Sequence, residues 1–204
     1  TLIASASAGD TITIPAGSFD WGSTVVDVTK NLKLVGAGKA TTFITSTVGN
    51  GLVISGGGMV SDFSITGPSG AGSGVINART VSGWRVGRIT LTTGTNTNQA
   101  FNADCPGVLF DSIINSGNGT DEGVWTTALG GTDAHAEQDA VWETDPVFGS
   151  VNAIYVENCT FNGSGYVSDF GYASRAVVRF CTITGKSQID AHGPESNWRS
   201  NRQI

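Results

Sequence analysis

Charge is scarce in this sequence, and positive charge is scarcer than negative charge. Charged residues make up 14% of the 204 residues, and 11 Lys and Arg against 17 Asp and Glu give a net charge of −6. Nucleic-acid binding requires clustered Lys and Arg, so this composition argues against nucleic acid as a partner. No apolar run approaches the roughly 18 residues of a membrane helix, so we expect no membrane span. An anionic polysaccharide as partner requires a local basic patch or a bridging cation.

The sequence also has few cysteines and lacks the periodicity of an amphipathic helix. The chain has three cysteines, Cys105, Cys159 and Cys181, and this odd number excludes a fully paired disulfide framework. The sequence contains no CxxC motif, so we do not expect a zinc site built on cysteines. No stretch places apolar residues at i, i+3, i+4 and i+7 over three turns, which argues against α/β folds with helical crossovers. The chain has no initial Met and no apolar leader, and neither end has an evident cap. We therefore expect a processed part of a longer protein.

Glycine and β-branched residues, by contrast, are abundant. Gly occurs 29 times, apolar residues reach 39%, and Ser, Thr and Asn are frequent. This composition predicts many short strands joined by tight turns.

Five segments repeat one strand-like pattern, with a large apolar residue in fourth place and Thr, Ser or Asn at most of the third and fifth places. They are residues 62–66 (DFSIT), 88–92 (RITLT), 111–115 (DSIIN), 158–162 (NCTFN) and 180–184 (FCTIT). Their fourth positions are 26, 23, 47 and 22 residues apart, and we interpret the 47 as two coils, one of them distorted by an insertion. An antiparallel sandwich would not require such an interval.

The repeat predicts an all-β fold, a right-handed single-stranded parallel β-helix with about 22–26 residues per coil. We expect one domain over residues 1–204 with a long loop insertion near 116–150. Equivalent positions should stack roughly 4.8 Å apart, as neighbouring strands do. Cys159 and Cys181 then become neighbours in an interior ladder; a disulfide between them is the alternative, but parallel side-chain vectors suit it poorly.

Several segments resemble a known superfamily. Residues 8–19 (AGDTITIPAGSF) are similar to the first coil of pectate-lyase-like β-helix proteins, and residues 31–38 (NLKLVGAG), followed by 42–44, resemble their second coil. Residues 152–158 and 190–193 resemble bacterial β-helix-repeat proteins. The resemblance implies the fold. It leaves the activity open, because the superfamily includes lyases, hydrolases, phage tailspikes and adhesins.

One candidate site lies in the predicted insertion. Asp133, His135, Glu137 and Asp139 alternate, so in an extended chain their side chains share one face, within reach of a hard cation such as Ca²⁺ or of a sugar. The alternative is a solvated polar loop. Ca²⁺ is the one cofactor that we expect.

A second candidate site lies near the C-terminal end. Asp190 and His192 point the same way in a strand, and a carboxylate beside an imidazole supports a general base. Arg199 and Arg202 would neutralise a uronate carboxylate and ease abstraction of the neighbouring proton. The alternative is a polar edge of the last coil.

A third possibility is an outward strand face bearing Tyr155, Glu157, Arg175 and Arg179, or else ordinary solvated positions. Among the tryptophans, Trp125, Trp142 and Trp198 are the candidates for stacking on sugar rings. Trp84 begins a strand that we expect to be half-buried.

Two functions fit these patterns. The first is a secreted or cell-surface protein that binds or degrades a polysaccharide, with lyase chemistry in which His192 is the base. The paired aspartates of β-helix glycosidases and the calcium-binding aspartate run of pectate lyases have no clear counterpart, so catalysis stays open. The second is a non-catalytic segment of a surface fibre, adhesin or phage tailspike. A monomer and a trimer are both compatible with the sequence.

Overall fold

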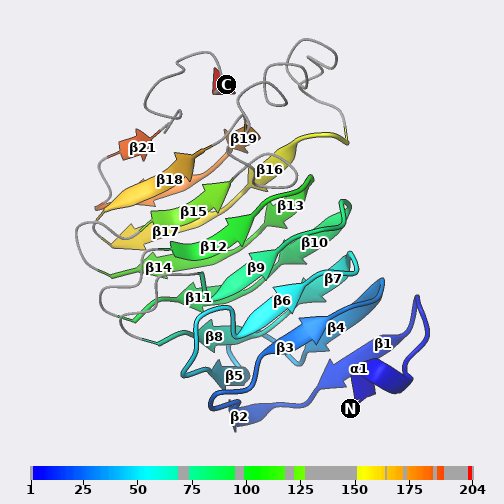
Figure 1. The fold of residues 1–204 in the computed structure, drawn as a ribbon. Helices are drawn as coiled ribbons and strands as arrows, with labels where there is room; N and C mark the ends of the chain where they lie inside the picture. The colour runs from blue at the N-terminus through cyan, green and yellow to red at the C-terminus, as the bar shows by residue number, and fades with distance from the viewer. Residues whose placement is uncertain are drawn as a thin grey trace.

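The computed structural model describes residues 2–68, 74–94, 99–117, 122–126, 151–163, 165–171, 174–185, 188–190 and 202–203. The chain winds through three parallel sheets in turn and forms a β-solenoid (Figure 1). Within these ranges the only helix is α1 (Leu2–Ser5), which precedes the first coil, and it lacks the length of a membrane span. The predicted all-β parallel β-helix is confirmed.

Each coil contributes strands to three sheets, which we call A, B and C. Sheet A contains β1 (Thr11–Ile14), β4 (Leu32–Gly36), β7 (Gly58–Ser61), β10 (Trp84–Gly87), β13 (Gly107–Phe110), β16 (Ile154–Glu157), β19 (Arg175–Arg179) and β22 (Arg202–Gln203). Sheet B contains β2 (Gly17–Asp20), β5 (Thr42–Thr45), β8 (Ser64–Thr66), β11 (Thr90–Thr92), β14 (Ile113–Ser116), β17 (Thr160–Gly163) and β20 (Thr182–Thr184). Sheet C contains β3 (Val26–Val28), β6 (Leu52–Ile54), β9 (Ile76–Ala78), β12 (Gln99–Ala103), β15 (Glu122–Thr126), β18 (Tyr166–Phe170) and β21 (Gln188–Asp190).

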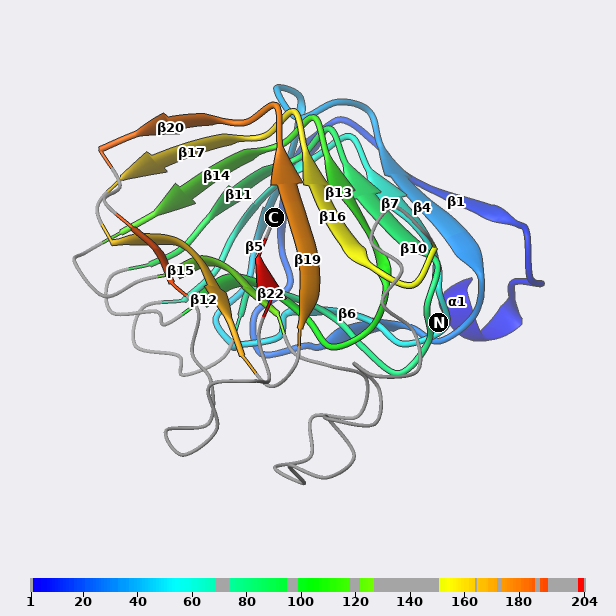
Figure 2. The ribbon, with the colours of Figure 1, turned by 90° about the horizontal axis from the view of Figure 1, so that it is seen from above.

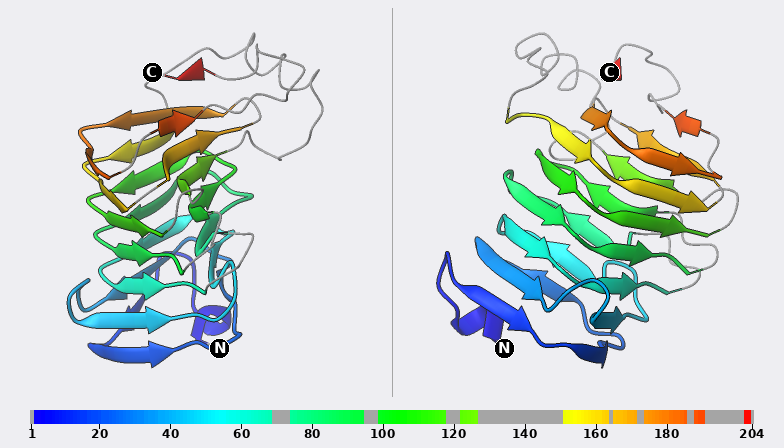
Figure 3. Two further views of the ribbon diagram at one scale, coloured as in Figure 1. Left: turned by 90° about the vertical axis from the view of Figure 1, so that its left-hand side faces the viewer. Right: turned by 180° about the vertical axis from the view of Figure 1, so that it is seen from behind.

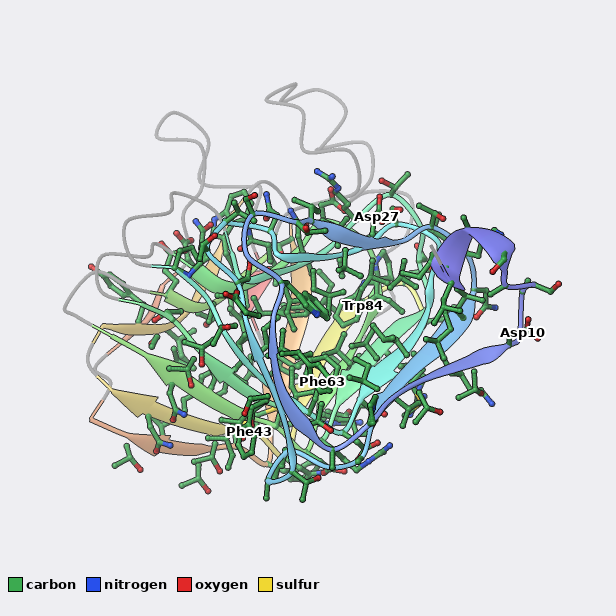
Figure 4. All side chains as sticks on the ribbon, turned by 90° about the horizontal axis from the view of Figure 1, so that it is seen from below. Asp10, Asp27, Phe43, Phe63 and Trp84 are labelled. Carbon is green, nitrogen blue, oxygen red and sulfur yellow. The ribbon has the colours of Figure 1, made fainter. Side chains whose placement is uncertain are left out.

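Seen from above, the three sheets enclose a common interior (Figure 2). Side views show the strands of each sheet stacked along one axis (Figure 3). Because side chains alternate across a strand, every coil sends one set of residues inward and another outward. Figure 4 shows this from below, with Phe63 and Trp84 within the coil and Asp10 outside it.

The five predicted anchor residues form one inward column of sheet B. Register pairs join Ile65 to Leu91, Leu91 to Ile114, Ile114 to Phe161 and Phe161 to Ile183. The first four are fully buried, whereas Ile183 is 44% exposed because β20 is the last strand of its sheet. The stacked apolar column that the repeat predicts is therefore confirmed, with an open upper end.

The interpretation of the 47-residue interval was wrong. Ile114 pairs directly with Phe161, so no further coil lies between them. Neighbouring parallel strands are defined by their hydrogen-bonded register and not by sequence distance, and the entropic cost of closing a loop grows only slowly with its length. A single coil therefore contains the long segment.

The predicted loop near 116–150 also contains a strand. β15 pairs with β12 on one side and with β18 on the other, so residues 122–126 complete sheet C of their coil. Its inward Val124 is fully buried, which explains why this short stretch is held in the sheet although its surroundings in sequence are polar.

A sharp corner separates each sheet A strand from the sheet B strand that follows. The residue at this corner has a positive φ in five coils: Asp62 (66°), Arg88 (52°), Asp111 (50°), Asn158 (53°) and Phe180 (59°). A left-handed residue turns the chain abruptly, and Asp and Asn tolerate this conformation better than Arg or Phe. These are the first residues of the five repeat segments, so the repeat begins at the corner.

Trp84 is fully buried on the inward side of β10, a strand that is half-buried as expected because its outward Arg85 is exposed. Its ring lies 5.2 Å from that of Phe101, and its Nε1 donates a hydrogen bond to the Cys105 carbonyl at 2.9 Å. The indole occupies the space that a side chain at Gly107, its register partner in β13, would fill.

Candidate binding face on sheet A

Positive charge on the strands is confined to one face of the solenoid. Every Lys or Arg within a described strand belongs to sheet A, whose only acidic strand residue is Glu157; the basic residues are Lys33, Arg85, Arg175, Arg179 and Arg202. The described strands of sheet C contain only acidic charges: Asp27, Glu122, Asp169 and Asp190. A protein with a net charge of −6 thus has a local basic face.

A cleft of about 420 Å³ lies on this face, over β10, β13, β16 and β19. Arg85, Val108 and Tyr155 line it and are register partners in consecutive strands, so they form one outward column. Glu157 and Arg179 also line it, from the next outward column. The alternation that directs Val86, Leu109 and Val156 into the core therefore directs these side chains into the cleft.

Arg179 is held at the upper side of the cleft by a carboxylate and two aromatic rings. Its Nε donates to Glu157 Oε1 at 2.8 Å. Its guanidinium carbon lies 5.6 Å from the ring centroid of Tyr155 and 5.5 Å from that of Phe180, within the range of cation–π attraction. The side chain is half-exposed. A guanidinium has five N–H donors, so this pairing leaves donors for an incoming anion.

Two further arginines contact the partly exposed ring of Phe110 on the same sheet. The guanidinium carbons of Arg85 and Arg88 lie 5.2 Å and 5.7 Å from the ring centroid of Phe110. That ring lies where a side chain at Gly87 would be, so glycine is required for this close approach. We call Arg85, Arg88, Phe110, Tyr155 and Arg179 the arginine–aromatic face.

Arg88 is fixed by a two-pronged contact with a carboxylate. Its Nε and Nη2 donate to Asp62 Oδ1 and Oδ2 at 2.8 Å and 2.7 Å. This hydrogen bonding lowers the pKa of Asp62 below its ordinary value and raises that of Arg88. Both groups are therefore charged over the range in which proteins are usually handled.

This arrangement suits an anionic, ring-containing ligand. Guanidinium groups bind carboxylates and sulfates through paired hydrogen bonds, and aromatic rings offer flat apolar area against sugar rings. Within the described part of the chain, His, Cys, Asp and Glu side chains form no group of three that would hold a metal ion.

The structure assigns the predicted substrate-binding Trp125 to another face. It lies in β15 of sheet C, half-buried, between its register partners Asn102 and Asp169. It therefore does not contribute to the cleft on sheet A. It remains a candidate for a separate contact.

Only the backbone positions of two predicted catalytic residues are described. Asp190 belongs to β21 in sheet C, where it pairs with Asp169, and Arg202 belongs to β22 in sheet A, where it pairs with Arg175. The remaining predicted site residues lie outside the described residues: His192 and Arg199 of the catalytic set, Trp142 and Trp198, and Asp133, His135, Glu137 and Asp139 of the cation site. Their roles stay predictions.

The sequence suggested an outward strand face that includes Tyr155, Glu157 and Arg179. The structure brings these three side chains together on sheet A. Arg85, Arg88 and Phe110 were missed. Residues 85 and 155 hold equivalent outward positions in their coils, and this equivalence could have indicated the shared face. It can be recognised in the sequence only when the 47-residue interval is counted as one coil.

Comparison with protein-family models, with curated proteins and with solved structures found no match to this chain. The structure shows the β-solenoid fold, and membership of the pectate-lyase-like superfamily stays a prediction from the sequence motifs.

Proposed function

We propose that this protein is a secreted, pectate-lyase-like β-solenoid that binds an acidic polysaccharide along the outer face of sheet A. The observation that carries the proposal is the placement of Arg85, Tyr155 and Arg179 around one cleft. A basic patch is what an overall acidic protein needs in order to attract an anionic polymer.

The spacing of the two arginines favours a polymer over a single small anion. Arg85 lies in β10 and Arg179 in β19, and two strands of sheet A separate them. At about 4.8 Å per strand, the two strands are roughly 14 Å apart. A single carboxylate or phosphate cannot contact both arginines when their strands are that far apart. A chain of acidic sugars can place one carboxylate at each arginine and a sugar ring against Tyr155.

Cleavage of the bound polymer is the further part of the proposal. His192 would remove the proton next to a uronate carboxylate, with Asp190 orienting the imidazole and Arg199 or Arg202 neutralising the substrate acid. A cation such as Ca²⁺ at Asp133, His135, Glu137 and Asp139 would bridge to the sugar acid. The sequence pattern alone supports these roles.

Binding is tested by affinity electrophoresis through gels that contain a polyuronate, with an uncharged glucan of similar length as the reference polymer. Arg85→Gln and Arg179→Gln should each weaken polyuronate binding about tenfold, equivalent to about 1.4 kcal/mol. Tyr155→Ala should weaken it by removing the ring. Raised salt should weaken binding by the wild type.

Lys39→Gln is the matched control, because it removes the same charge from a position outside the strands of sheet A. It should leave the retardation within about twofold of wild type, a difference of about 0.4 kcal/mol. Equal losses in Lys39→Gln and Arg179→Gln would mean that net charge, and not the cleft, governs retention. No retention by wild type would remove the proposal.

Lyase activity is tested separately, by following the ultraviolet absorbance of unsaturated products. His192→Ala should abolish that signal and keep the retardation. Retention without any product formation leaves a binding protein. The absence of both, together with a trimer in light scattering, would establish the alternative of a structural fibre segment or tailspike.

A further inference from the structure

Two of the three cysteines occupy equivalent corners of neighbouring coils. Cys159 follows the corner residue Asn158, and Cys181 follows the corner residue Phe180. The next residues, Thr160 and Thr182, are register partners, and the Thr182 N–H donates to the Cys159 carbonyl at 2.8 Å. The two thiols therefore lie one above the other, as the repeat predicts.

Their surroundings differ. Cys159 is 1% exposed, and its Sγ lies 3.3 Å from the Glu157 carbonyl oxygen. Cys181 is partly exposed, with its Sγ 3.3 Å from the Arg179 carbonyl oxygen. Among the described residues, the inward corner column ends at Cys181. Cys159 is thus buried, while Cys181 is partly exposed.

The pair also differs in acidity. Hydrogen bonding from the Cys159 thiol lowers the pKa of Cys181 to about 7, and the same contact together with burial raises the pKa of Cys159. A thiolate is the form that attacks disulfides. The less buried cysteine is therefore also the one with the larger thiolate fraction near neutral pH.

We propose that Cys181 is a reactive thiol that exchanges with small-molecule disulfides and is then resolved by Cys159 into a disulfide between the two last thiol-bearing coils. In the first step the Cys181 thiolate attacks one sulfur of the small disulfide, forms a mixed disulfide and releases one small thiolate. In the second step Cys159 loses its proton to solvent, attacks the Cys181 sulfur and expels the second small thiolate. The protein loses two electrons and two protons, and the small disulfide is reduced to two thiols.

The distance between the coils allows this bond. Equivalent backbone positions in neighbouring strands are about 4.8 Å apart, inside the roughly 4.4–6.8 Å between the Cα atoms of disulfide-bonded cysteines. Parallel side-chain vectors oppose closure, so a change of side-chain rotamer is needed. The partly exposed Cys181 has room for it, whereas Cys159 is packed.

Cys105 provides a control within the same chain. It is fully buried, and its Sγ lies 3.3 Å from the Val81 carbonyl oxygen. Burial raises the pKa of its thiol to about 12. A buried and protonated thiol should not react in the native protein.

The experiment treats the reduced, folded protein with an aromatic disulfide whose released thiolate is coloured, and follows colour and intact mass. Wild type should release one equivalent rapidly and a second more slowly, and its final mass should be two hydrogens below that of the reduced protein. Cys159→Ser should stop after the first equivalent and retain the adduct. Cys181→Ser should lose at least about nine-tenths of the fast rate, and Cys105→Ser should match wild type.

The fast rate should rise with pH through the region of about 7. A fast phase that survives in Cys181→Ser, or a wild-type adduct that never resolves, would overturn the proposal. Peptide mapping of acid-quenched wild type is the measurement that does not depend on any variant folding. It should find Cys159 linked to Cys181, and a linkage to Cys105 would equally count against the proposal.

Discussion

The outer faces of sheets A and B differ in chemistry although their inner faces are built alike. Both sheets send a column of aliphatic and aromatic residues into the core. Outward, sheet A has the arginine–aromatic face, while one outward row of sheet B contains hydroxyls, amides and a single carboxylate: Asp20, Thr45, Thr66, Thr92, Asn115, Asn162 and Thr184.

The row on sheet B is partly satisfied by its own members. Asn162 Nδ2 donates to Asn115 Oδ1 at 3.0 Å, and Asn115 Nδ2 donates to Thr92 Oγ1 at 3.4 Å. The arginines of sheet A instead contact rings and single carboxylates. Inward positions repeat because every coil must bury the same kind of surface, whereas outward positions are free to specialise.

Substitutions at inward positions should cause the largest loss of stability, and the loss should be similar for sheets A and B. Leu109→Ala in sheet A and Leu91→Ala in sheet B each remove a fully buried side chain. We expect each to lower the free energy of unfolding by about 2–5 kcal/mol, measured by urea denaturation. A loss confined to one sheet would show that the two inner faces are not equivalent.

Two glycines sharpen the contrast between the inner and outer sides of sheet A. A methyl group at Gly107 would collide with the buried Trp84 ring, and one at Gly87 with the outward Phe110 ring. Gly107→Ala should cost about 1–3 kcal/mol, because a packed core cannot yield.

Gly87→Ala should lower the stability measured by thermal unfolding less than Gly107→Ala does, because the Phe110 ring can rotate into solvent. It should nevertheless weaken polyuronate retention by displacing the ring under Arg85. Equal stability losses in the two glycine variants would contradict this assignment of sides.

Removing an outward polar group should separate stability from binding. Asn115→Ala breaks two hydrogen bonds of the sheet B row and should cost about 1 kcal/mol, with polyuronate retention unchanged. Arg179→Ala breaks a half-exposed ion pair and should cost less than about 1 kcal/mol, with retention reduced. Urea denaturation and gel retardation of both variants test whether Asn115→Ala affects mainly stability and Arg179→Ala mainly polyuronate binding.

The smallest effect should be a pH dependence at the Asp62–Arg88 pair. Arg88 lowers the folded-state pKa of Asp62, so the pair stabilises the fold above the unfolded value near 3.8. This stabilisation is lost as the pH falls through the lower, folded-state pKa. The difference in stability between wild type and Arg88→Gln should therefore shrink in acid. A difference that is constant from neutral to acid pH would argue against the ion pair.

The sequence predicted the interior better than the surface. The anchors Ile65, Leu91, Ile114, Phe161 and Ile183 could be recognised because burial imposes the same requirement on every coil. The long interval before Phe161 was misread, since residue counting cannot distinguish an inserted segment from an extra coil. That error also concealed the outward column from Arg85 to Tyr155.

By itself the sequence determined an all-β solenoid, the residues of its apolar column and the stacking of Cys159 on Cys181, because these follow from local alternation repeated along the chain. Only the tertiary structure decided which outward residues share a face. Arg85, Tyr155 and Arg179 are far apart in sequence and meet through the register of β10, β13, β16 and β19. Register depends on hydrogen bonds between coils, and no local pattern specifies which coils are neighbours.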